Sequence, residues 1–287
     1  MSDHGDPPST ARPPLRLVIL DMDGVLYRGD RAIPGAANLV GLLHEAGVAV
    51  RYATNNSMFT RDQYAERLAA MDIPAAANEI VTSTSATIEH LRRHQPDVRA
   101  VLAVGAAGMV TELDAAGYSV VPIAAAASAA ADAQPFDAVL VGLDPDFDEG
   151  RLAVAAAAVR AGARFVATNA DARYPTPSGF RPGAGAMVAA IAEASGVAPL
   201  VIGKPEPAMF AAILEAAGVE PAAALVIGDN PDSDIAGAHR SGIRSVLVLT
   251  GVTDADQAVG LTGDRRPDHV VADPAAAWDL LEGWLAP

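Results

Sequence analysis

Residues 17–24 read Leu17-Val18-Ile19-Leu20-Asp21-Met22-Asp23-Gly24, an apolar strand that ends in two carboxylates two residues apart. Strand side chains alternate between faces, so Asp21 and Asp23 leave this strand on the same side. Gly24 lets the backbone turn sharply and leaves amide groups free to point at bound oxygens. The pattern suits a hard cation held together with an anion, although two solvated turn residues would look the same.

Composition limits the class of protein. The chain has 287 residues, of which 51% are hydrophobic, so it can bury a sizeable core as one large or two medium domains. Its net charge of -15 argues against nucleic acid as a partner, because the polyphosphate backbone would be repelled. With no cysteine, disulfides, thiolate nucleophiles and Cys-based zinc sites are excluded, and a metal would need oxygen or histidine ligands.

Two segments are candidates for a signal peptide or a membrane span, and neither fits. Residues 1–14 carry four prolines and no apolar core of a signal peptide, so we expect a disordered tail. The Ala-rich run at 123–131 is too short to span a bilayer. We therefore expect a cytoplasmic protein that contacts no membrane.

Short apolar runs alternate with helical segments along the chain. Six helices are expected to end in a small residue followed by glycine, which fits the left-handed position that closes a helix. Unbroken apolar strands of this kind are buried on both faces, which predicts parallel sheets covered by helices, an α/β fold with a Rossmann-like core. The glycines are Gly47, Gly117, Gly162, Gly196, Gly218 and Gly242, and the expected strands are 15–20, 48–53, 100–104, 118–121, 136–141, 164–167, 200–202, 224–227 and 245–249.

Polar residues collect just after three further expected strands, where ligands bind in such folds. Thr54, Asn55 and Asn56 follow the second strand and suit a phosphate, or simply form a polar turn before a helix that Thr60 and Gln63 would cap. Lys204 follows residues 200–202, on a segment stiffened by Pro205 and Pro207, and would otherwise be an ordinary surface lysine. Asp229 and Asp234 follow residues 224–227 and could be plain helix caps.

The four segments together are harder to explain as turns. Asp21, Asp23, Asp229 and Asp234 would repel one another unless a divalent cation and the Lys204 ammonium compensated them. Oxygen-only ligands with open positions suit Mg²⁺, which binds through few carboxylates plus a substrate phosphate.

In order and spacing these motifs resemble those of the haloacid dehalogenase superfamily, over nearly the whole chain from residue 15. The residues within these motifs are similar to those of one branch of the superfamily, which contains p-nitrophenyl, phosphoglycolate, glycerol-phosphate, pyridoxal-phosphate and nucleotide monophosphate phosphatases. The resemblance implies magnesium-dependent hydrolysis of a small phosphate monoester. The motifs are Asp21-Met-Asp-Gly, Thr54-Asn-Asn-Ser, Gly203-Lys-Pro-Glu-Pro and Gly228-Asp-Asn-Pro-Asp-Ser-Asp.

The resemblance also implies roles for these residues. Asp21 would be the nucleophile that forms an aspartyl-phosphate, and Asp23 would protonate the leaving oxygen and then activate water. Mg²⁺ would be held by the Asp21 carboxylate, the Asp23 main-chain carbonyl and Asp229, with Asp234 orienting them from behind. The phosphate-binding residues would be Thr54, Asn55, Asn56 and Lys204. Carbon–halogen cleavage is a weaker alternative, because family members with that activity lack an acid at the position of Asp23.

A second domain is expected between Asn56 and Lys204, which lie farther apart than a simple crossover requires. We expect a helix at 82–94 and a hinge at 95–97, with a core of 15–97 plus 199–287 and an inserted α/β cap of 98–198. In related enzymes the cap loop faces the leaving group, so Asn169, Asp171, Tyr174 and Arg181 are candidates for substrate specificity, although a polar surface loop fits equally well. Related enzymes often dimerise through the cap, so a homodimer is a further expectation.

Two other functions stay open at this stage. A phosphotransferase or mutase would use the same aspartyl-phosphate and pass it to a sugar hydroxyl. A non-catalytic protein could bind a phosphorylated metabolite, although Asp21, Asp23, Lys204 and Asp229 are all present. The sequence does not name the metabolite.

Overall fold

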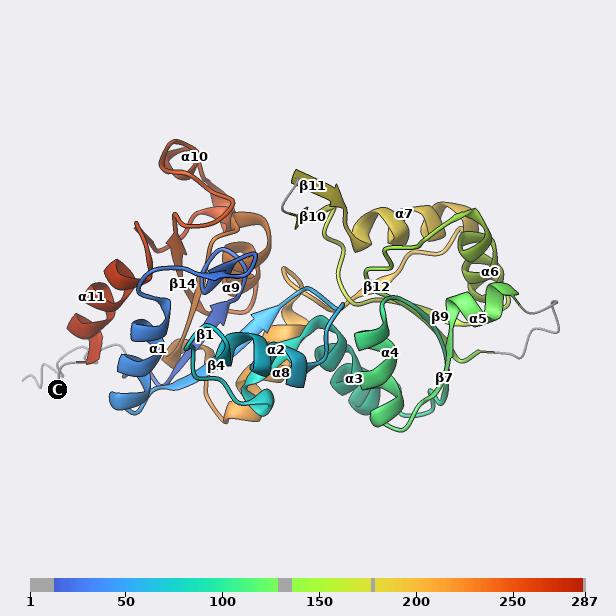
Figure 1. The fold of residues 1–287 in the computed structure, drawn as a ribbon, viewed down its shortest axis with the longest axis horizontal. Helices are drawn as coiled ribbons and strands as arrows, with labels where there is room; N and C mark the ends of the chain where they lie inside the picture. The colour runs from blue at the N-terminus through green and yellow to red at the C-terminus, as the bar shows by residue number, and fades with distance from the viewer. Residues whose placement is uncertain (1–12, 129–135, 177–178, 286–287) are drawn as a thin grey trace, which may run out of the picture.

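The computed structural model of the chain describes residues 13–128, 136–176 and 179–285. Two parallel sheets, each covered by helices, lie side by side along the long axis (Figure 1). The tail predicted over residues 1–14 lies outside the described residues up to residue 12, and so does the end of the Ala-rich run from 129. Within the described parts of the chain, no helix is long and apolar enough to cross a bilayer.

A six-stranded sheet is built from strands of the N-terminal and C-terminal parts of the chain. Its order is β15-β14-β13-β1-β4-β5, and all its strand pairs are parallel. The carboxyl ends of the strands therefore meet at one edge, where a ligand can bind. The strands are β1 Leu17–Asp21, β4 Ala49–Thr54, β5 Ile80–Thr82, β13 Ala224–Gly228, β14 Arg244–Val248 and β15 His269–Val271.

Both faces of the central strands of this sheet are buried, as the unbroken apolar strands predict. Leu17 and Ile19 of β1 pack with side chains of α8 and α9, whereas Val18 and Leu20 pack with those of α1, α2 and α11. Fully burying one such side chain stabilises the fold by roughly 1.5–3 kcal/mol. Because β1 has apolar side chains on both faces, it is most stable at the centre of the sheet. The covering helices are α1 Ala36–Glu45, α2 Arg61–Ala69, α8 Pro207–Ala217, α9 Ala236–Arg240 and α11 Pro274–Leu285, with α10 Ala255–Val259 at the periphery.

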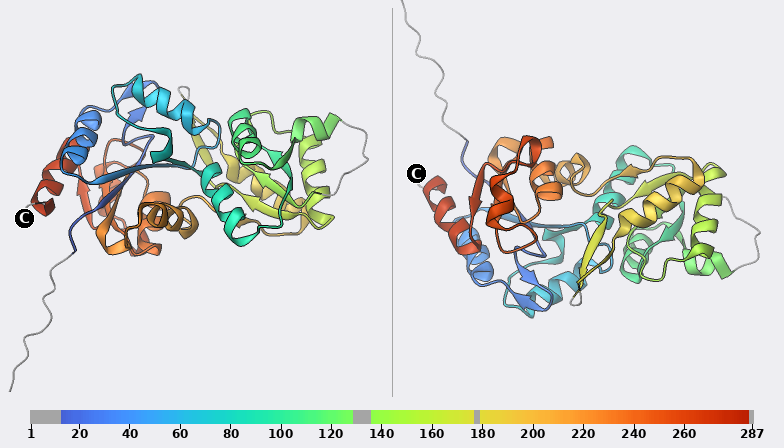
Figure 2. Two further views of the ribbon diagram at one scale, coloured as in Figure 1. Left: turned by 90° about the horizontal axis from the view of Figure 1, so that it is seen from below. Right: turned by 90° about the horizontal axis from the view of Figure 1, so that it is seen from above.

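The five-stranded sheet comes from the middle of the chain, in the order β12-β9-β8-β6-β7. Its strand β12 pairs with β9, so this sheet extends to Val201, past the predicted end of the insert at 198. Figure 2 shows its green and yellow elements as a separate half of the molecule. Its elements are β6 Ala100–Val104, α4 Ala107–Ala115, β7 Ser119–Pro122, α5 Ile123–Ser128, β8 Ala138–Val141, α6 Glu149–Arg160, β9 Arg164–Ala167, α7 Ala184–Ser195 and β12 Leu200–Val201.

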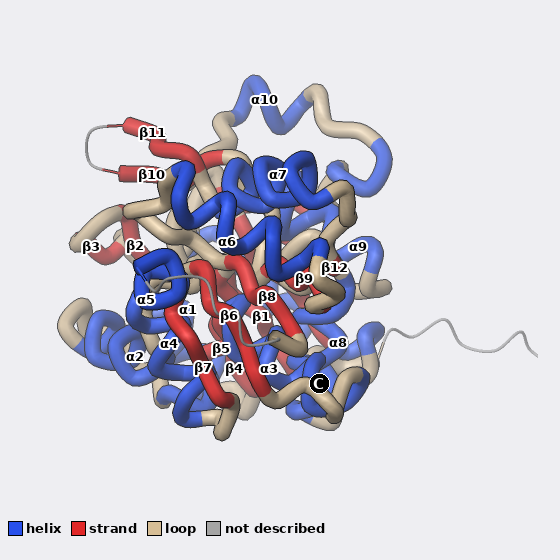
Figure 3. The backbone as a smooth tube through the Cα atoms, turned by 90° about the vertical axis from the view of Figure 1, so that its right-hand side faces the viewer, coloured by secondary structure: helices blue, strands red, loops and turns tan. Residues whose placement is uncertain are grey.

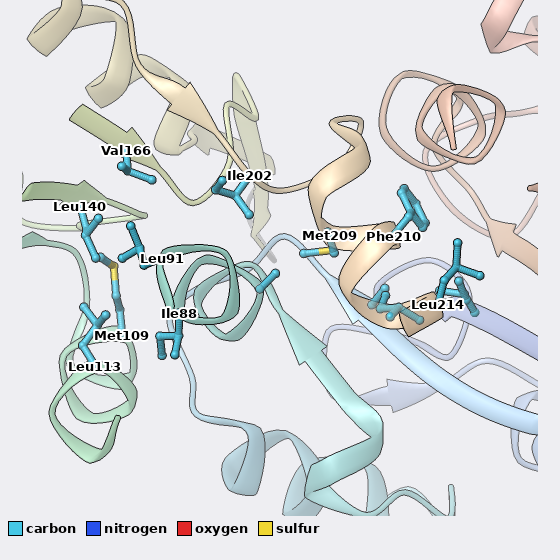
Figure 4. Close-up of a cluster of buried hydrophobic side chains, with 14 of the residues drawn as sticks. Ile88, Leu91, Met109, Leu113, Leu140, Val166, Ile202, Met209, Phe210 and Leu214 are labelled. Carbon is cyan, nitrogen blue, oxygen red and sulfur yellow. The ribbon is translucent and has the colours of Figure 1, made fainter. Parts of the chain in front are cut away.

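Helix α3, Ser83–His94, joins the two halves. Its Ile88 and Leu91 belong to one apolar cluster that also contains Leu140 of the five-stranded sheet and Phe210 of α8 (Figure 4). The cluster is continuous from one half to the other. The halves are therefore packed together through α3 and are not joined by a linker alone.

The helix ends predicted from glycine are confirmed. All six glycines have positive φ, between 62° at Gly218 and 107° at Gly162. Thr60 and Gln63 form the predicted capping box of α2. The Asp148 side chain accepts a hydrogen bond from Arg151 N and caps α6.

Two hairpins and two short strands were not predicted. The region expected as a polar loop around Tyr174 contains β10 Arg173–Thr176, which pairs antiparallel with β11 Gly179–Pro182. A smaller hairpin, β2 Tyr27–Arg28 with β3 Arg31–Ala32, lies on the same side of the molecule (Figure 3). These hairpins, β5 and β15 are short, and both hairpins carry arginine, so they lack the apolar runs that mark the buried strands.

Candidate active site

Lys204 is the centre of a buried polar cluster at the carboxyl edge of the six-stranded sheet. Its Nζ donates to Asp21 Oδ1 at 2.5 Å, to Asp234 Oδ1 at 2.7 Å and to the carbonyl oxygen of Ala53 at 3.0 Å. Only 3% of Lys204 is exposed, which a lysine tolerates only when its charge is compensated. The motifs that the sequence placed in four separate segments thus meet in space.

Three carboxylates converge beside this ammonium. Asp21, Asp229 and Asp234 each present one oxygen within 4.8 Å of the others. Asp21 ends β1, Asp229 follows β13, and Asp234 lies in a π-helical turn, Pro231–Ile235. Asp234 Oδ2 also accepts from Asn230 N at 3.2 Å.

The charges of the cluster are unevenly compensated. Burial raises the pKa of Asp21 well above its ordinary value, against the opposing effect of Lys204. Burial would lower the pKa of Lys204, but Asp21 and Asp234 together raise it above its ordinary value. Burial and the neighbouring Asp234 raise the pKa of Asp229 to about 7. Three carboxylates beside one ammonium leave net negative charge that a further cation would stabilise.

Asp23 lies on the exposed side of the loop after β1, two residues beyond Asp21. Partial burial raises the pKa of its carboxyl group, while the nearby Arg67 and Arg28 lower it. A raised pKa is the property that a general acid needs.

Two glycines make room for Asp229. A Cβ on Gly24, whose φ is +89°, would lie 2.3 Å from Asp229 Oδ2, and one on Gly251 would lie 1.7 Å from the same atom. The Asp229 Oδ2 also accepts from Val252 N at 2.6 Å. Only glycine fits at both positions, because any Cβ would push the carboxylate out of the cluster.

Thr54 and Asn56 form the loop after β4. Thr54 is buried, and its Oγ1 accepts from Asn56 N at 3.1 Å. Asn56 Oδ1 accepts from Met58 N at 2.9 Å, so the Asn56 side chain closes the turn before α2.

Asn55 connects this loop to two other segments. Its Nδ2 donates to Lys204 O at 2.8 Å and to both carboxylate oxygens of Asp171 at 3.1 Å, and its Oδ1 accepts from Lys204 N at 2.9 Å. A Cβ on Gly203 would lie 2.5 Å from that Oδ1. The Asn55 side chain is therefore engaged in a joint that holds the backbone of Lys204.

The four predicted specificity residues fall into two groups. Asn169 is buried and donates to Asn55 O at 2.7 Å, so Asn169 and Asp171 both contact the joint instead of facing outward. Tyr174 and Arg181 lie opposite each other in the β10–β11 hairpin, where Tyr174 is half-buried and Arg181 is exposed. The structure brings the first pair to the Lys204 cluster and leaves the second pair on the hairpin.

One part of the site was missed in the sequence. Residues 250–253 follow β14, and in addition to the Val252 contact, Thr250 Oγ1 donates to Gly24 O at 2.7 Å and Thr253 Oγ1 to Asp229 O at 2.8 Å. The signal was present, because an apolar strand is again followed by Thr-Gly. That signal marks only a turn after a strand, because residues 250–253 contain no carboxylate or lysine that would indicate a catalytic role.

The parallel α/β fold with lysine-bridged carboxylates at its strand ends agrees with what comparison with known families finds. Residues 18–119 match the family described as haloacid dehalogenase-like hydrolase, and residues 201–277 match a second description, HAD-hydrolase-like. The chain is 34% identical to the acid sugar phosphatase of Staphylococcus haemolyticus over 92% of this chain and 95% of the relative. It is 31% identical to a 5'-nucleotidase of Bacillus subtilis over 93% and 96%.

A solved structure agrees with these relatives. The glycerol phosphate phosphatase of Mycobacterium tuberculosis in complex with magnesium superposes with a TM-score of 0.79 and 33% identity, over 92% of this chain and 76% of that one. The protein belongs to the haloacid dehalogenase-like hydrolases, and it is a phosphatase. The predicted family, fold class and enzyme class are confirmed.

Proposed function

We propose that the protein hydrolyses small phosphate monoesters with Mg²⁺, through a phosphoryl group carried on Asp21. The observation that carries the proposal is the contact of Lys204 Nζ with both Asp21 and Asp234, next to Asp229. Such a cluster supplies a nucleophile, a fixed positive charge and a metal-binding group in one place.

The residues present fit Mg²⁺. The donors are carboxylate oxygens, which this ion prefers, and burial together with Asp234 raises the pKa of Asp229 to about 7. Asp21, Asp229 and the main chain of Asp23 would hold the ion, with Asp234 orienting them. When bound, the ion would neutralise charge on the phosphate and on the carboxylates.

Asp21 would attack phosphorus with one carboxylate oxygen. The new bond joins that oxygen to phosphorus while the bond from phosphorus to the leaving oxygen breaks, and Asp23 gives its proton to the leaving oxygen. In the second step Asp23 takes a proton from water, and the water oxygen attacks phosphorus. The bond to Asp21 breaks and inorganic phosphate is released.

Lys204 and Thr54 would bind the phosphate. Phosphoryl transfer depends mainly on positioning and on charge neutralisation around phosphorus, and a rigid ammonium meets both needs. The joint at Asn55 supports this role, because it fixes the Lys204 backbone on both its N–H and C=O sides.

Tyr174 and Arg181 remain the candidates for contact with the leaving group, since they lie on the hairpin and are not engaged at the joint. The relatives' names refer to sugar, nucleoside and glycerol phosphates, which share a phosphate on a small polar group. We propose a phosphorylated metabolite of that kind as the substrate.

The test is a phosphate-release screen over sugar, nucleotide and vitamin phosphates, with Mg²⁺ and with excess chelator. We expect release that depends on Mg²⁺ for a limited set of substrates. An isomeric phosphate product without release would instead identify a phosphotransferase or mutase. Phosphate binding without turnover of any substrate would identify a binding protein.

A further inference from the structure

Residues 57–61 connect the Thr54–Asn56 loop to α2, and we call them the connector. At its start, Ser57 Oγ accepts a hydrogen bond from Leu143 N, after β8, at 3.1 Å. Ser57 is fully buried. The five-stranded half thus contacts the connector directly beside the proposed phosphate loop.

Helix α4 of the same half lies against the connector. A Cβ on Gly108 would lie 2.4 Å from Met58 O and 2.7 Å from Phe59 Cα, so α4 approaches this backbone as closely as glycine allows. Any larger residue would have to push the helix or the connector away.

Glu112 of α4 holds the end of the connector. Its Oε1 accepts from Arg61 N at 2.8 Å and from Arg61 Nε at 3.3 Å. Arg61 is the first residue of α2, so the Glu112 carboxylate satisfies a free N–H at a helix N-terminus, where negative charge is favoured. Its other oxygen accepts from Thr82 Oγ1 at 3.3 Å.

These contacts continue to the proposed catalytic lysine. The residue after Thr82 is Ser83, whose Oγ donates to Asn55 O at 2.7 Å. Asn55 in turn holds Lys204 N and O. A short series of buried hydrogen bonds therefore runs from Glu112 to the Lys204 backbone.

The hydrogen-bond partners of Glu112 indicate that it joins the two halves. It is buried, with 8% exposed, yet Arg61 and Thr82 both lie outside the five-stranded half. A buried carboxylate is costly unless it is well bonded, and these bonds do nothing to fold α4 itself. They fix only how the two halves meet.

We propose that Glu112 is a positioning residue, which together with Gly108 docks α4 on the connector and so holds the Thr54–Asn56 loop and Lys204 in phosphate-binding geometry. The inference rests on the proposed function for the identity of the bound group. It assigns the five-stranded half a role in binding phosphate, in addition to any contact with the leaving group.

The first test is Glu112→Ala, with Asp148→Ala as the matched control. Asp148 is also a helix-capping carboxylate of this half, and its side chain accepts from Arg151 N of its own helix α6. The readouts are the Kd of inorganic phosphate by calorimetry with Mg²⁺, and kcat/KM on p-nitrophenyl phosphate. We expect both to worsen about tenfold in Glu112→Ala, since small misplacements at such a site are costly.

The control should separate positioning from stability. Asp148→Ala should lower Tm by about 2–4 °C, as loss of a helix cap does, with phosphate affinity unchanged. Glu112→Gln should rescue most of the loss, because an amide oxygen still accepts from Arg61 N and the amide N–H can donate to Thr82. Phosphate affinity and kcat/KM that are unchanged in Glu112→Ala would overturn the proposal.

A second variant covers the case in which Glu112→Ala does not fold. Gly108→Ala should stabilise an ordinary helix, but here the Cβ must displace the connector, so we expect about tenfold weaker phosphate binding. Gly41→Ala in α1 is its control, because nothing lies within 4 Å of the added Cβ. Equal phosphate affinity in both variants would contradict the docking role.

The two proposals fail in different ways. Wild-type protein that binds phosphate with Mg²⁺ but turns over no substrate contradicts the proposed function, and the phosphate Kd of the variants still tests Glu112. Wild-type turnover with an unaffected Glu112→Ala variant contradicts only the role of Glu112.

Discussion

At the scale of single residues, the site is explained by where charge can be balanced. Lys204 forms ion pairs with Asp21 and Asp234, and Asp229 is the carboxylate whose charge we propose that a metal ion balances. The carboxylates and the lysine could be predicted from sequence, because residues at strand ends of a parallel sheet meet at one edge. The orientation of Asn55 could not, since an asparagine in a turn can bond in many directions.

Asp21→Asn should abolish turnover while the protein stays folded. The amide keeps an acceptor for Lys204 Nζ but is a poor nucleophile, so we expect kcat to fall by about 10³ or more with little change in Tm. The matched control is Asp232→Asn, an exposed carboxylate of the nearby turn that pairs with Arg265. Near wild-type kcat in Asp21→Asn would remove Asp21 as the nucleophile.

Binding of Mg²⁺ should depend on pH through Asp229. Its pKa of about 7 in the metal-free protein means that it takes up a proton as pH falls below 7, and the ion must displace that proton. We expect the Kd of Mg²⁺ to weaken about tenfold from pH 8 to pH 6. Calorimetry in two buffers of different ionisation enthalpy measures the released proton. A Kd that stays constant over this range would contradict the assignment.

At the scale of elements, the pattern of apolar residues predicted the main strands. The hairpins and the segment after β14 could not be predicted in this way. The nine expected strands are present within a residue or two, because short apolar runs between helices are typical of strands in α/β folds. The β10–β11 hairpin was missed, since Arg173 and Arg181 interrupt the apolar pattern of its two strands. The segment 250–253 was missed because it acts through backbone and hydroxyl groups.

Gly251→Ala tests that segment. The added Cβ would lie 1.7 Å from Asp229 Oδ2, so it must displace the carboxylate. We expect kcat/KM to fall about 100-fold and the Mg²⁺ Kd to rise, as for misplaced groups at other active sites. Gly260→Ala is the control, because its nearest new contact is an ordinary 3.8 Å. Unchanged Mg²⁺ binding in Gly251→Ala would show that Asp229 is not held by this turn.

At the scale of the whole molecule, the two halves are joined by apolar and by polar contacts. One apolar cluster runs through α3 from one sheet to the other, and the polar joint at Asn55 lies at the same junction. The presence of an inserted α/β unit could be predicted from the long separation of Asn56 and Lys204. The contacts between the halves could not, since a polar residue such as Asn55 or Glu112 does not reveal from sequence which residue of the other half it bonds to.

Variants of the joint and of the hairpin should differ in their effect on specificity. Asp171→Ala removes a partner of Asn55, so we expect kcat/KM to fall by a similar factor, about tenfold, for every substrate. Arg181→Ala leaves the joint intact and should change the ratio of kcat/KM between substrates. The measurement is a panel of substrates for both variants. A substrate-selective effect of Asp171→Ala with a uniform effect of Arg181→Ala would reverse the assignment.

The most direct test of the central claim is to trap the phosphoryl group on the enzyme. The reaction with p-nitrophenyl phosphate and Mg²⁺ is stopped with acid during turnover, and the protein is digested at acidic pH and analysed by fragmentation mass spectrometry. The account predicts one added phosphoryl group on Asp21, absent in Asp21→Asn. A phosphoryl group on another residue, or phosphate release without any covalent adduct, would contradict it.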